Sequence, residues 1–170
     1  NGTSAAPDNC LCVSDAATPP TTLATTASVA TTSTSALTVA GFVYIYGMIF
    51  SSGSTSSAAN IQLGASTGAT GIIAESCLLK YNSTYSTGRI TLGGIASATS
   101  VDRYIKLKNT TVQFGAVTQA LRCGGNIEIE NLILAGSVPT TLMVVLASCH
   151  TITRVSASNL SSLGSSNLVD

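Results

Sequence analysis

The feature that most constrains this chain is a short alternating pattern that recurs along it. Five segments read apolar, variable, apolar, variable, and then a small residue or Asn. They are Val43–Gly47, Ile72–Ser76, Ile105–Asn109, Ile127–Asn131 and Val155–Asn159. Alternation with a period of two is typical of a β-strand with one buried face. It therefore predicts buried side chains at Val43, Ile45, Ile72, Ala74, Ile105, Leu107, Ile127, Ile129, Val155 and Ala157.

A second series of strand-like segments interleaves with the first. Its members are Ile61–Gly64, Ile90–Gly93, Leu121–Gly124 and a weaker one at Val144–Ala147. The spacings in the two series lengthen and shorten together, and no segment keeps a helical period of 3.6. Repeats of this size with short strands and Gly/Ser/Thr turns indicate a solenoid. We therefore expect an all-β chain, a right-handed parallel β-helix of about five rungs.

Residues 1–40 differ in composition from the rest of the chain. They contain Pro7, Pro19 and Pro20 and long Thr/Ala/Ser tracts, with few aliphatic side chains. The prolines and β-branched threonines disfavour a helix. We expect residues 1–40 to be an extended arm or linker that orders only against another surface. Residues 41–170 would be the β-helix domain, within a longer polypeptide.

The charge content is low and balanced. Charged residues make up 8% of the chain, with seven acidic and seven basic side chains, while 24 Ser and 24 Thr supply the polar surface. A net charge of zero argues against nucleic acid or an anionic membrane as a partner. The longest apolar stretch is too short for a membrane span and contains glycines. This profile is typical of an extracellular or virion β protein.

Charged side chains fall at the outward positions of three successive predicted rungs. Stacking in register predicts a ladder of Glu75, Lys108 and Glu130, with Lys106 beside Glu128. Opposite charges on neighbouring strands stabilise by a few tenths to about 1 kcal/mol per pair. The ladder is therefore interpreted as structural.

Two aromatic side chains and three asparagines also fall at repeated positions. Tyr44 and Tyr46 would both point outward from one strand, which makes them candidate contact residues for the arm, a neighbouring subunit or another protein. A stacked amide ladder is predicted at Asn109, Asn131 and Asn159.

Candidate catalytic and metal-binding groups are sparse. The only close group of carboxylates, Glu75, Glu128 and Glu130, has lysines at the equivalent positions of adjacent predicted rungs. The single histidine, His150, lacks a neighbouring carboxylate in the sequence. Cys10 and Cys12 are half of a metal site at best, and Cys77, Cys123 and Cys149 are interpreted as small buried side chains. We predict no catalytic residue, no cofactor and no metal.

The segments FVYIYGMIFSSG, YIKLKNTTVQFG and NIEIENLILAGSVPTTL resemble the rungs of β-helical virion proteins of tailed bacteriophages. That group includes tailspike and fibre shafts and capsid-decorating proteins. The resemblance implies a structural or attachment role in the virus particle, often as a homotrimer. Its implied partners are other virion proteins and copies of the chain itself, with a host surface glycan as a further candidate.

The expected function is that of a non-enzymatic structural protein of a phage particle, located in the virion. Two alternatives remain open at this point. One is part of a β-helical polysaccharide-degrading enzyme, which a cluster of unpaired carboxylates on one face would favour. The other is the stalk of a bacterial surface adhesin, which an upstream signal sequence would favour.

Overall fold

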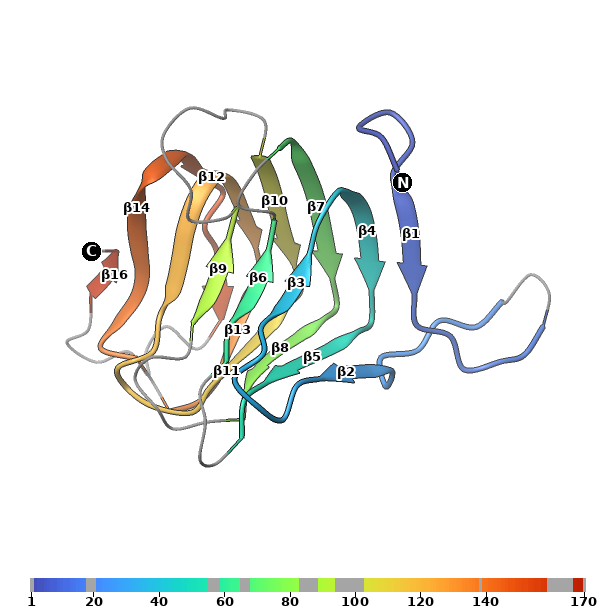
Figure 1. The fold of residues 1–170 in the computed structure, drawn as a ribbon, viewed down its shortest axis with the longest axis horizontal. Coiled ribbons are helices and arrows are strands. Elements are labelled where there is room, and N and C mark those ends of the chain that lie inside the picture. Colours follow the sequence, from blue (N-terminus) through green and yellow to red (C-terminus); the bar gives the residue numbers. More distant parts are fainter. Residues whose placement is uncertain are drawn as a thin grey trace.

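The protein is an all-β chain of parallel strands. The computed structural model describes residues 2–17, 21–54, 59–64, 68–82, 89–93, 103–137, 139–158 and 167–169. In these residues every paired strand is parallel to its neighbour and no helix occurs, while one isolated antiparallel bridge joins Val13 to Leu23. The strands form two sheets, of which the larger is strongly curled (Figure 1).

The chain passes through three series of strands in a repeating order. The first series is β1 (Asp8–Leu11), β4 (Phe42–Tyr46), β7 (Thr70–Glu75), β10 (Arg103–Lys108) and the later parts of β12 (Leu121–Glu130) and β14 (Thr141–Thr153). The second is β2 (Ser28–Ala30), β5 (Ile49–Ser52), β8 (Leu78–Tyr81), β11 (Thr111–Phe114), β13 (Leu132–Gly136) and β15 (Ala157–Ser158). The third is β3 (Leu37–Val39), β6 (Ile61–Leu63), β9 (Ile90–Leu92), the early parts of β12 and β14, and β16 (Asn167–Val169).

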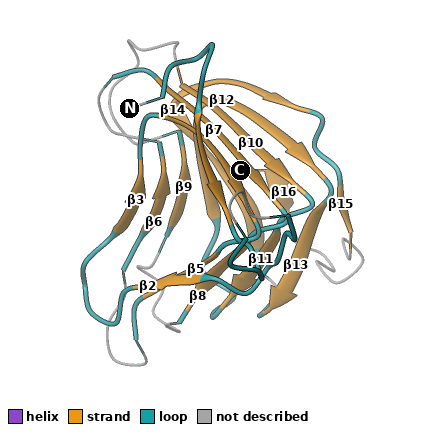
Figure 2. Cartoon of the chain, turned by 90° about the vertical axis from the view of Figure 1, so that its right-hand side faces the viewer, coloured by secondary structure: helices purple, strands orange, loops and turns teal. Residues whose placement is uncertain are grey.

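Strands β12 and β14 belong to two series at once. Each runs from the third series into the first without a break, so these two series form a single ten-stranded sheet that curls around the core. The second series forms a separate six-stranded sheet (Figure 2). The core lies between them and is mostly aliphatic, because it is built from the inward positions of the strands from β3 to β14.

The alternating pattern correctly predicted most of the buried positions. Seven of the ten predicted side chains are at most 1% exposed, namely Ile45, Ile72, Ala74, Ile105, Leu107, Ile127 and Ile129. They stack in two columns across β4, β7, β10 and β12, as the register pairs show. Val43 is half-buried, and the side chain of Ala157 lies outside the described residues.

The fifth repeat was placed wrongly. Val155 is 37% exposed, and the register partner of Ile127 is Ile152. Ala157 instead pairs with Leu132 in the second series, and Asn159 lies outside the described residues. The cause is a pair of register shifts between β12 and β14. Because of these shifts, Ile127 aligns with Ile152 and not with a residue of the alternating segment 155–159.

The segment Val144–Ala147, predicted from the sequence as the equivalent of Leu121–Gly124, is also displaced, by one residue. In the structure both segments belong to the third series. Leu121 pairs with Met143 and Cys123 pairs with Val145, so the strand aligns from Met143 and not from Val144. Met143 is fully buried, which explains the alignment, since its side chain continues the apolar column.

Strands occur before residue 41 as well. β1, β2 and β3 pair in register with β4, β5 and β6, so the sheets begin within the segment assigned to an extended arm. The low aliphatic content of that segment still has a structural counterpart, because every residue of β1 and β2 is exposed. These strands are therefore added to the sheets mainly through backbone hydrogen bonds.

The corner between the first and second series repeats one backbone conformation. Positive φ angles occur at Gly47, Ser76, Asn109, Asn131 and Arg154, with values of 73°, 53°, 49°, 56° and 50°. Glycine and asparagine tolerate this left-handed region best. The side-chain amide nitrogen of Asn131 donates to the side-chain oxygen of Asn109 at 2.9 Å, so the predicted amide ladder is present between these two residues.

A buried threonine follows this corner in β10–β11 and joins two passes of the chain. The hydroxyl of Thr110, which is fully buried, lies 3.0 Å from the carbonyl oxygen of Ala74 and 3.1 Å from that of Lys108. Cys77 occupies the same place one pass earlier, with its Sγ near the carbonyls of Ile45 and Glu75.

Replacing Thr110 with valine is expected to destabilise the protein by about 1–3 kcal/mol, because buried carbonyl oxygens lose a hydrogen-bond donor. Urea unfolding followed by circular dichroism measures the difference. Thr111→Val, at a half-buried position one residue further on, is the matched control and should change stability by less than about 0.5 kcal/mol. Equal effects of the two substitutions would contradict this role of the hydroxyl.

Candidate functional site

Aromatic side chains collect on the outer face, the surface formed by the outward side chains of β4, β7, β10 and the later part of β12. The chain has eight Phe and Tyr residues. Four of them, Phe42, Tyr44, Tyr46 and Tyr104, lie at outward positions of β4 and β10. Since the core is mainly aliphatic, this placement marks the outer face as a candidate contact surface.

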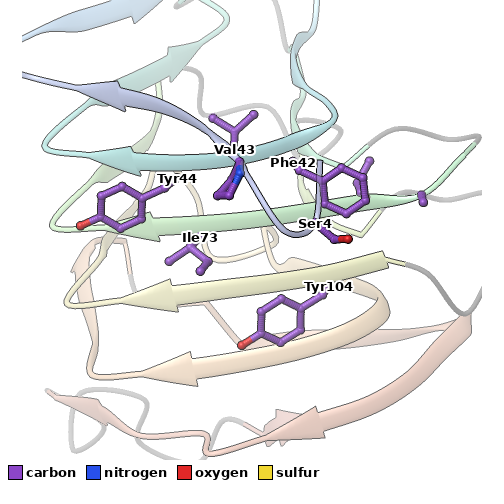
Figure 3. Close-up of a pocket in the computed structure, with 10 residues that line it drawn as sticks. Ser4, Phe42, Val43, Tyr44, Ile73 and Tyr104 are labelled. Atoms are coloured by element: carbon purple, nitrogen blue, oxygen red, sulfur yellow. The ribbon is translucent and has the colours of Figure 1, made fainter. Parts of the chain in front are cut away.

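An open, mostly apolar hollow of about 540 Å³ lies on this face. Figure 3 shows Phe42, Tyr44, Ile73 and Tyr104, which come from three neighbouring strands. Ser4 and Pro7, in the segment before β1, contribute to the wall.

A glycine lies on β7 beneath one of the aromatic rings of the hollow. The register pairs Gly71 with Phe42 on one side and with Tyr104 on the other. A Cβ at Gly71 would lie 2.8 Å from Cδ1 of Phe42, so the ring rests directly against the glycine backbone. The missing side chain therefore leaves room on β7 for the edge of the Phe42 ring.

Two tyrosine hydroxyls are held by carboxylates at the edge of the hollow. The hydroxyl of Tyr44 donates to Oε2 of Glu75 at 3.0 Å, and the hydroxyl of Tyr104 donates to Oε2 of Glu128. Partial burial, with the nearby carboxylate adding to it, raises the pKa of Tyr44 to about 12 and that of Tyr104 to about 12. Both phenols are therefore neutral donors at physiological pH, and their rings are fixed in orientation.

The charged residues of the predicted ladder align as expected, but one of the expected ion pairs is replaced by another. Lys106 aligns with Glu128, and Lys108 aligns with both Glu75 and Glu130. Nζ of Lys106 lies 3.1 Å from Glu128 and 3.2 Å from Glu130, whereas Nζ of Lys108 lies 3.0 Å from Glu75. Glu130 thus contacts the lysine diagonal to it, in place of the one directly opposite.

The surroundings of two of these carboxylates favour their charged form. The hydrogen bond from Lys108 lowers the pKa of Glu75, and the hydrogen bonds from Tyr104 and then Lys106 lower the pKa of Glu128. Arg154, which sequence reasoning did not include, approaches Glu128 at 3.7 Å. The pKa of Lys106 is raised, chiefly by its hydrogen bond to Glu128.

Of the two tyrosines predicted as contact residues, one lines the hollow and the other does not. Tyr44 lines it, whereas Tyr46 is half-buried further along β4, next to Leu11 and Glu75 in the register. Sequence reasoning missed Phe42, Ile73 and Tyr104. The available signal was the outward parity of these positions in segments already assigned as strands.

The described residues offer no group of three or more His, Cys, Asp or Glu side chains that could hold a metal ion. Cys77 and Cys123 are buried, as predicted, while Cys149 is half-buried. Burial raises the pKa of the Cys123 thiol to about 12, so this side chain stays protonated in the core. In the part of the chain that the structure describes, no helix is long and apolar enough to cross a membrane.

Comparison with known proteins gives no family assignment: no family model matches the chain, and neither the curated proteins nor the solved structures contain a match.

Acid is expected to weaken the fold through the ion pairs of the outer face. Since the pKa of Glu75 lies below its ordinary value of 4.5, its contribution is present above roughly pH 4.5 and is lost as the pH falls through the lower folded value. The Glu75→Gln variant should lose less stability than the unmodified protein between roughly pH 6 and pH 3.

Lys108→Met should flatten the same pH dependence, because it removes the main cause of the lowered pKa. Urea midpoints measured across this range provide the test. If both variants follow the acid profile of the unmodified protein, these ion pairs do not stabilise the folded state.

Proposed function

We propose that this chain is a right-handed parallel β-helix that serves as a non-enzymatic structural protein of a bacteriophage particle. It would decorate the capsid or form part of a tail spike or fibre, acting through contacts with other virion proteins and copies of itself. The observation that supports the β-helix is the repeated order of the three strand series, in which each strand aligns in parallel with the strand one pass later.

The β-helix assignment is supported by the connections between the strands. A parallel strand can only return beside its predecessor through a crossover, and here the other two series form that crossover in every pass. Crossovers between parallel strands are right-handed in about 98% of cases. The same rule supports the right-handed sense proposed here.

A structural role is supported by the state of the outer carboxylates. Glycoside hydrolysis needs two carboxyl groups, one of them with a raised pKa so that it still carries a proton. Glu75 and Glu128 have lowered pKa values, and Lys106 contacts both Glu128 and Glu130. This arrangement favours ion pairing over proton donation.

The phage assignment itself rests on the sequence resemblance, and it is tested on particles. Gradient-purified virus particles from the source of the sequence are digested and analysed by mass spectrometry. Peptides of this chain should co-purify with the major capsid protein at a fixed ratio. Recovery of these peptides from cell-surface fractions, and not from particles, would favour the adhesin stalk and overturn the proposal.

The enzyme alternative has its own test. The purified chain, incubated with host surface polysaccharide, should release no reducing ends above the background of a heat-denatured sample. Release that disappears in Glu128→Gln or Glu130→Gln would overturn the non-enzymatic role.

A further inference from the structure

We propose that the hollow on the outer face is a binding site for a quaternary ammonium group, the positively charged, fully alkylated nitrogen of small molecules such as choline. The inference goes beyond the structural role proposed above and does not depend on the chain being part of a virus particle. It rests on the aromatic walls of the hollow, the uncharged side chains that line it and the carboxylates bound to two of its rings.

Three aromatic rings contribute to the walls of the hollow. Phe42 and Tyr44 lie two residues apart on β4, and Tyr104 lies on β10, with Gly71 of β7 between it and Phe42 in the register. At a rise of about 3.3 Å per residue and about 4.8 Å between strands, the Cα atoms of Tyr44 and Tyr104 lie roughly 7 Å and roughly 10 Å from that of Phe42. Figure 3 shows the three rings on one face of the sheet. A cation attracts the face of an aromatic ring within about 6 Å of its centre, so one cation in the hollow can act on more than one ring.

The lining favours a cation that is covered by carbon atoms. In the part of the chain that the structure describes, the side chains that line the hollow are uncharged and mostly apolar. A primary ammonium group is strongly hydrated, so it loses much of its hydration on entering such a surface. A quaternary ammonium group has no N–H, and its carbon atoms can pack against Ile73 while the charge stays close to the ring faces.

Two of the rings are bound to carboxylates, which adds negative potential to the hollow. The hydroxyl of Tyr44 donates to Glu75, and that of Tyr104 donates to Glu128. A hydrogen bond to a carboxylate polarises the phenol and makes the face of its ring more negative. Because each phenol has a single hydrogen, neither hydroxyl can donate to a ligand without losing this bond. The hollow therefore suits a cation better than an anion.

Two lysines near the hollow are held by carboxylates. Nζ of Lys106, on β10, contacts Glu128 and Glu130 of β12, which lies on the side of β10 away from β7. Nζ of Lys108 contacts Glu75. Because each ammonium group is paired, the adjacent carboxylate offsets its repulsion of a cation in the hollow.

The size of the hollow agrees with a small ligand. At about 540 Å³ it lies within the range of roughly 300–1,000 Å³ that small-molecule sites occupy. Ser4 and Pro7, before β1, supply part of the wall, and the turn that contains Ser4 is closed by backbone hydrogen bonds between Thr3 and Ala6. The volume accommodates the ammonium group together with the chain attached to it.

Binding is tested on the whole chain by isothermal titration calorimetry at constant ionic strength. The probes are choline, its neutral isostere 3,3-dimethyl-1-butanol, which has carbon in place of the charged nitrogen, and ethanolamine, which has a primary ammonium group. Choline should bind saturably with a Kd below about 10 mM, and at least about threefold more tightly than either comparator. A weaker Kd for choline overturns the proposal. A comparator within about threefold of choline also overturns it, because the hollow would then recognise apolar shape alone or any ammonium group.

Variants locate the site and separate the aromatic ring from its apolar volume. Phe42→Leu keeps an apolar side chain but removes the aromatic face, so it should weaken choline binding at least about threefold. Tyr46→Leu is the matched control, since Tyr46 lies on the same face of β4 but outside the hollow, and should change the Kd by less than about twofold. Circular dichroism melts establish that each variant is folded.

A second measurement uses the unmodified protein and needs no substitution that affects folding. In NMR titrations the ring protons of Phe42 and Tyr104 should shift with choline concentration, while those of Tyr46 stay in place. Equal losses in Phe42→Leu and Tyr46→Leu, or ring shifts confined to other residues, would place the ligand elsewhere and overturn the proposal. The outcome is independent of the particle test above, because a chain absent from particles can still bind choline and a chain present in them can fail to do so.

Discussion

Gly93→Ala is expected to destabilise the protein by at least about 4 kcal/mol, which is at the upper end of single-substitution effects. Gly93 follows β9 and has a φ of 81°, a conformation that L side chains rarely adopt. A Cβ on this residue would overlap the carbonyl oxygen of Gly124 in the next pass of the chain. Because that oxygen belongs to the backbone, a side-chain rotation cannot relieve the overlap.

Gly41→Ala separates the steric effect from the conformational one. Gly41 has a similar φ of 93°, but a Cβ there meets no atom within 4 Å. This control should cost only about 1–2 kcal/mol, the penalty of the left-handed conformation. Urea unfolding of both variants measures the difference, and similar losses for the two would mean that Gly124 does not approach Gly93 as closely as the structure indicates.

Leu107→Ala is the second substitution with a large expected effect, a loss of about 2–5 kcal/mol of unfolding free energy. Leu107 is fully buried and aligns with Ala74 in one neighbouring strand and Ile129 in the other. Ala74 is too small to fill the space that the leucine leaves, so a cavity is expected to persist between the passes. Part of the cost depends on that cavity.

The control for Leu107→Ala is Val117→Ala, at a position that is 50% exposed. Its effect should stay within about 0.5 kcal/mol. Chemical denaturation of the two variants under identical conditions gives both values. A loss below about 1 kcal/mol for Leu107→Ala would show that the inward column is loosely packed or that the leucine is not in it.

Register could be predicted in the middle of the chain because two independent signals coincide there. The alternation of Ile105 and Leu107 matches that of Ile127 and Ile129, and the charges between them are opposite. A shift by one residue would move every apolar side chain to the outside. The pairing of β10 with β12 is therefore fixed by hydrophobic burial, and the structure has the predicted partners.

The last pass could not be predicted because a chance alternation competed with the true one. Residues 155–157 alternate as well as Ile152 and its neighbours do, and the spacing of earlier repeats favoured the later choice. The true partner of Ile127 comes earlier in the chain than predicted because the register between β12 and β14 shifts where both strands pass through a corner. Such irregularities depend on contacts between passes, which the local sequence does not record.

The candidate site was predictable only in part for a different reason. Outward parity follows from alternation, so Tyr44 and Tyr46 were found within one strand. The hollow, however, joins Tyr44 to Tyr104, 60 positions further along, and also to Ser4. Which outward residues become neighbours depends on the lengths of several intervening turns, and those lengths differ between passes.

The corner of positive φ angles has a consequence for inserting foreign peptides into this chain. β4–β5, β7–β8 and β10–β11 are joined there by two residues each, whereas six residues, 115–120, join β11 to β12. An epitope placed between Asn109 and Thr110 would break the contacts that couple consecutive passes. One placed beside the exposed Val117 would leave those contacts at Asn109 and Thr110 intact, and the bonds at risk there are the two that Thr140 donates to the carbonyl oxygen of Val117. The fold thus distinguishes an edge suited to peptide display from one that must keep its length.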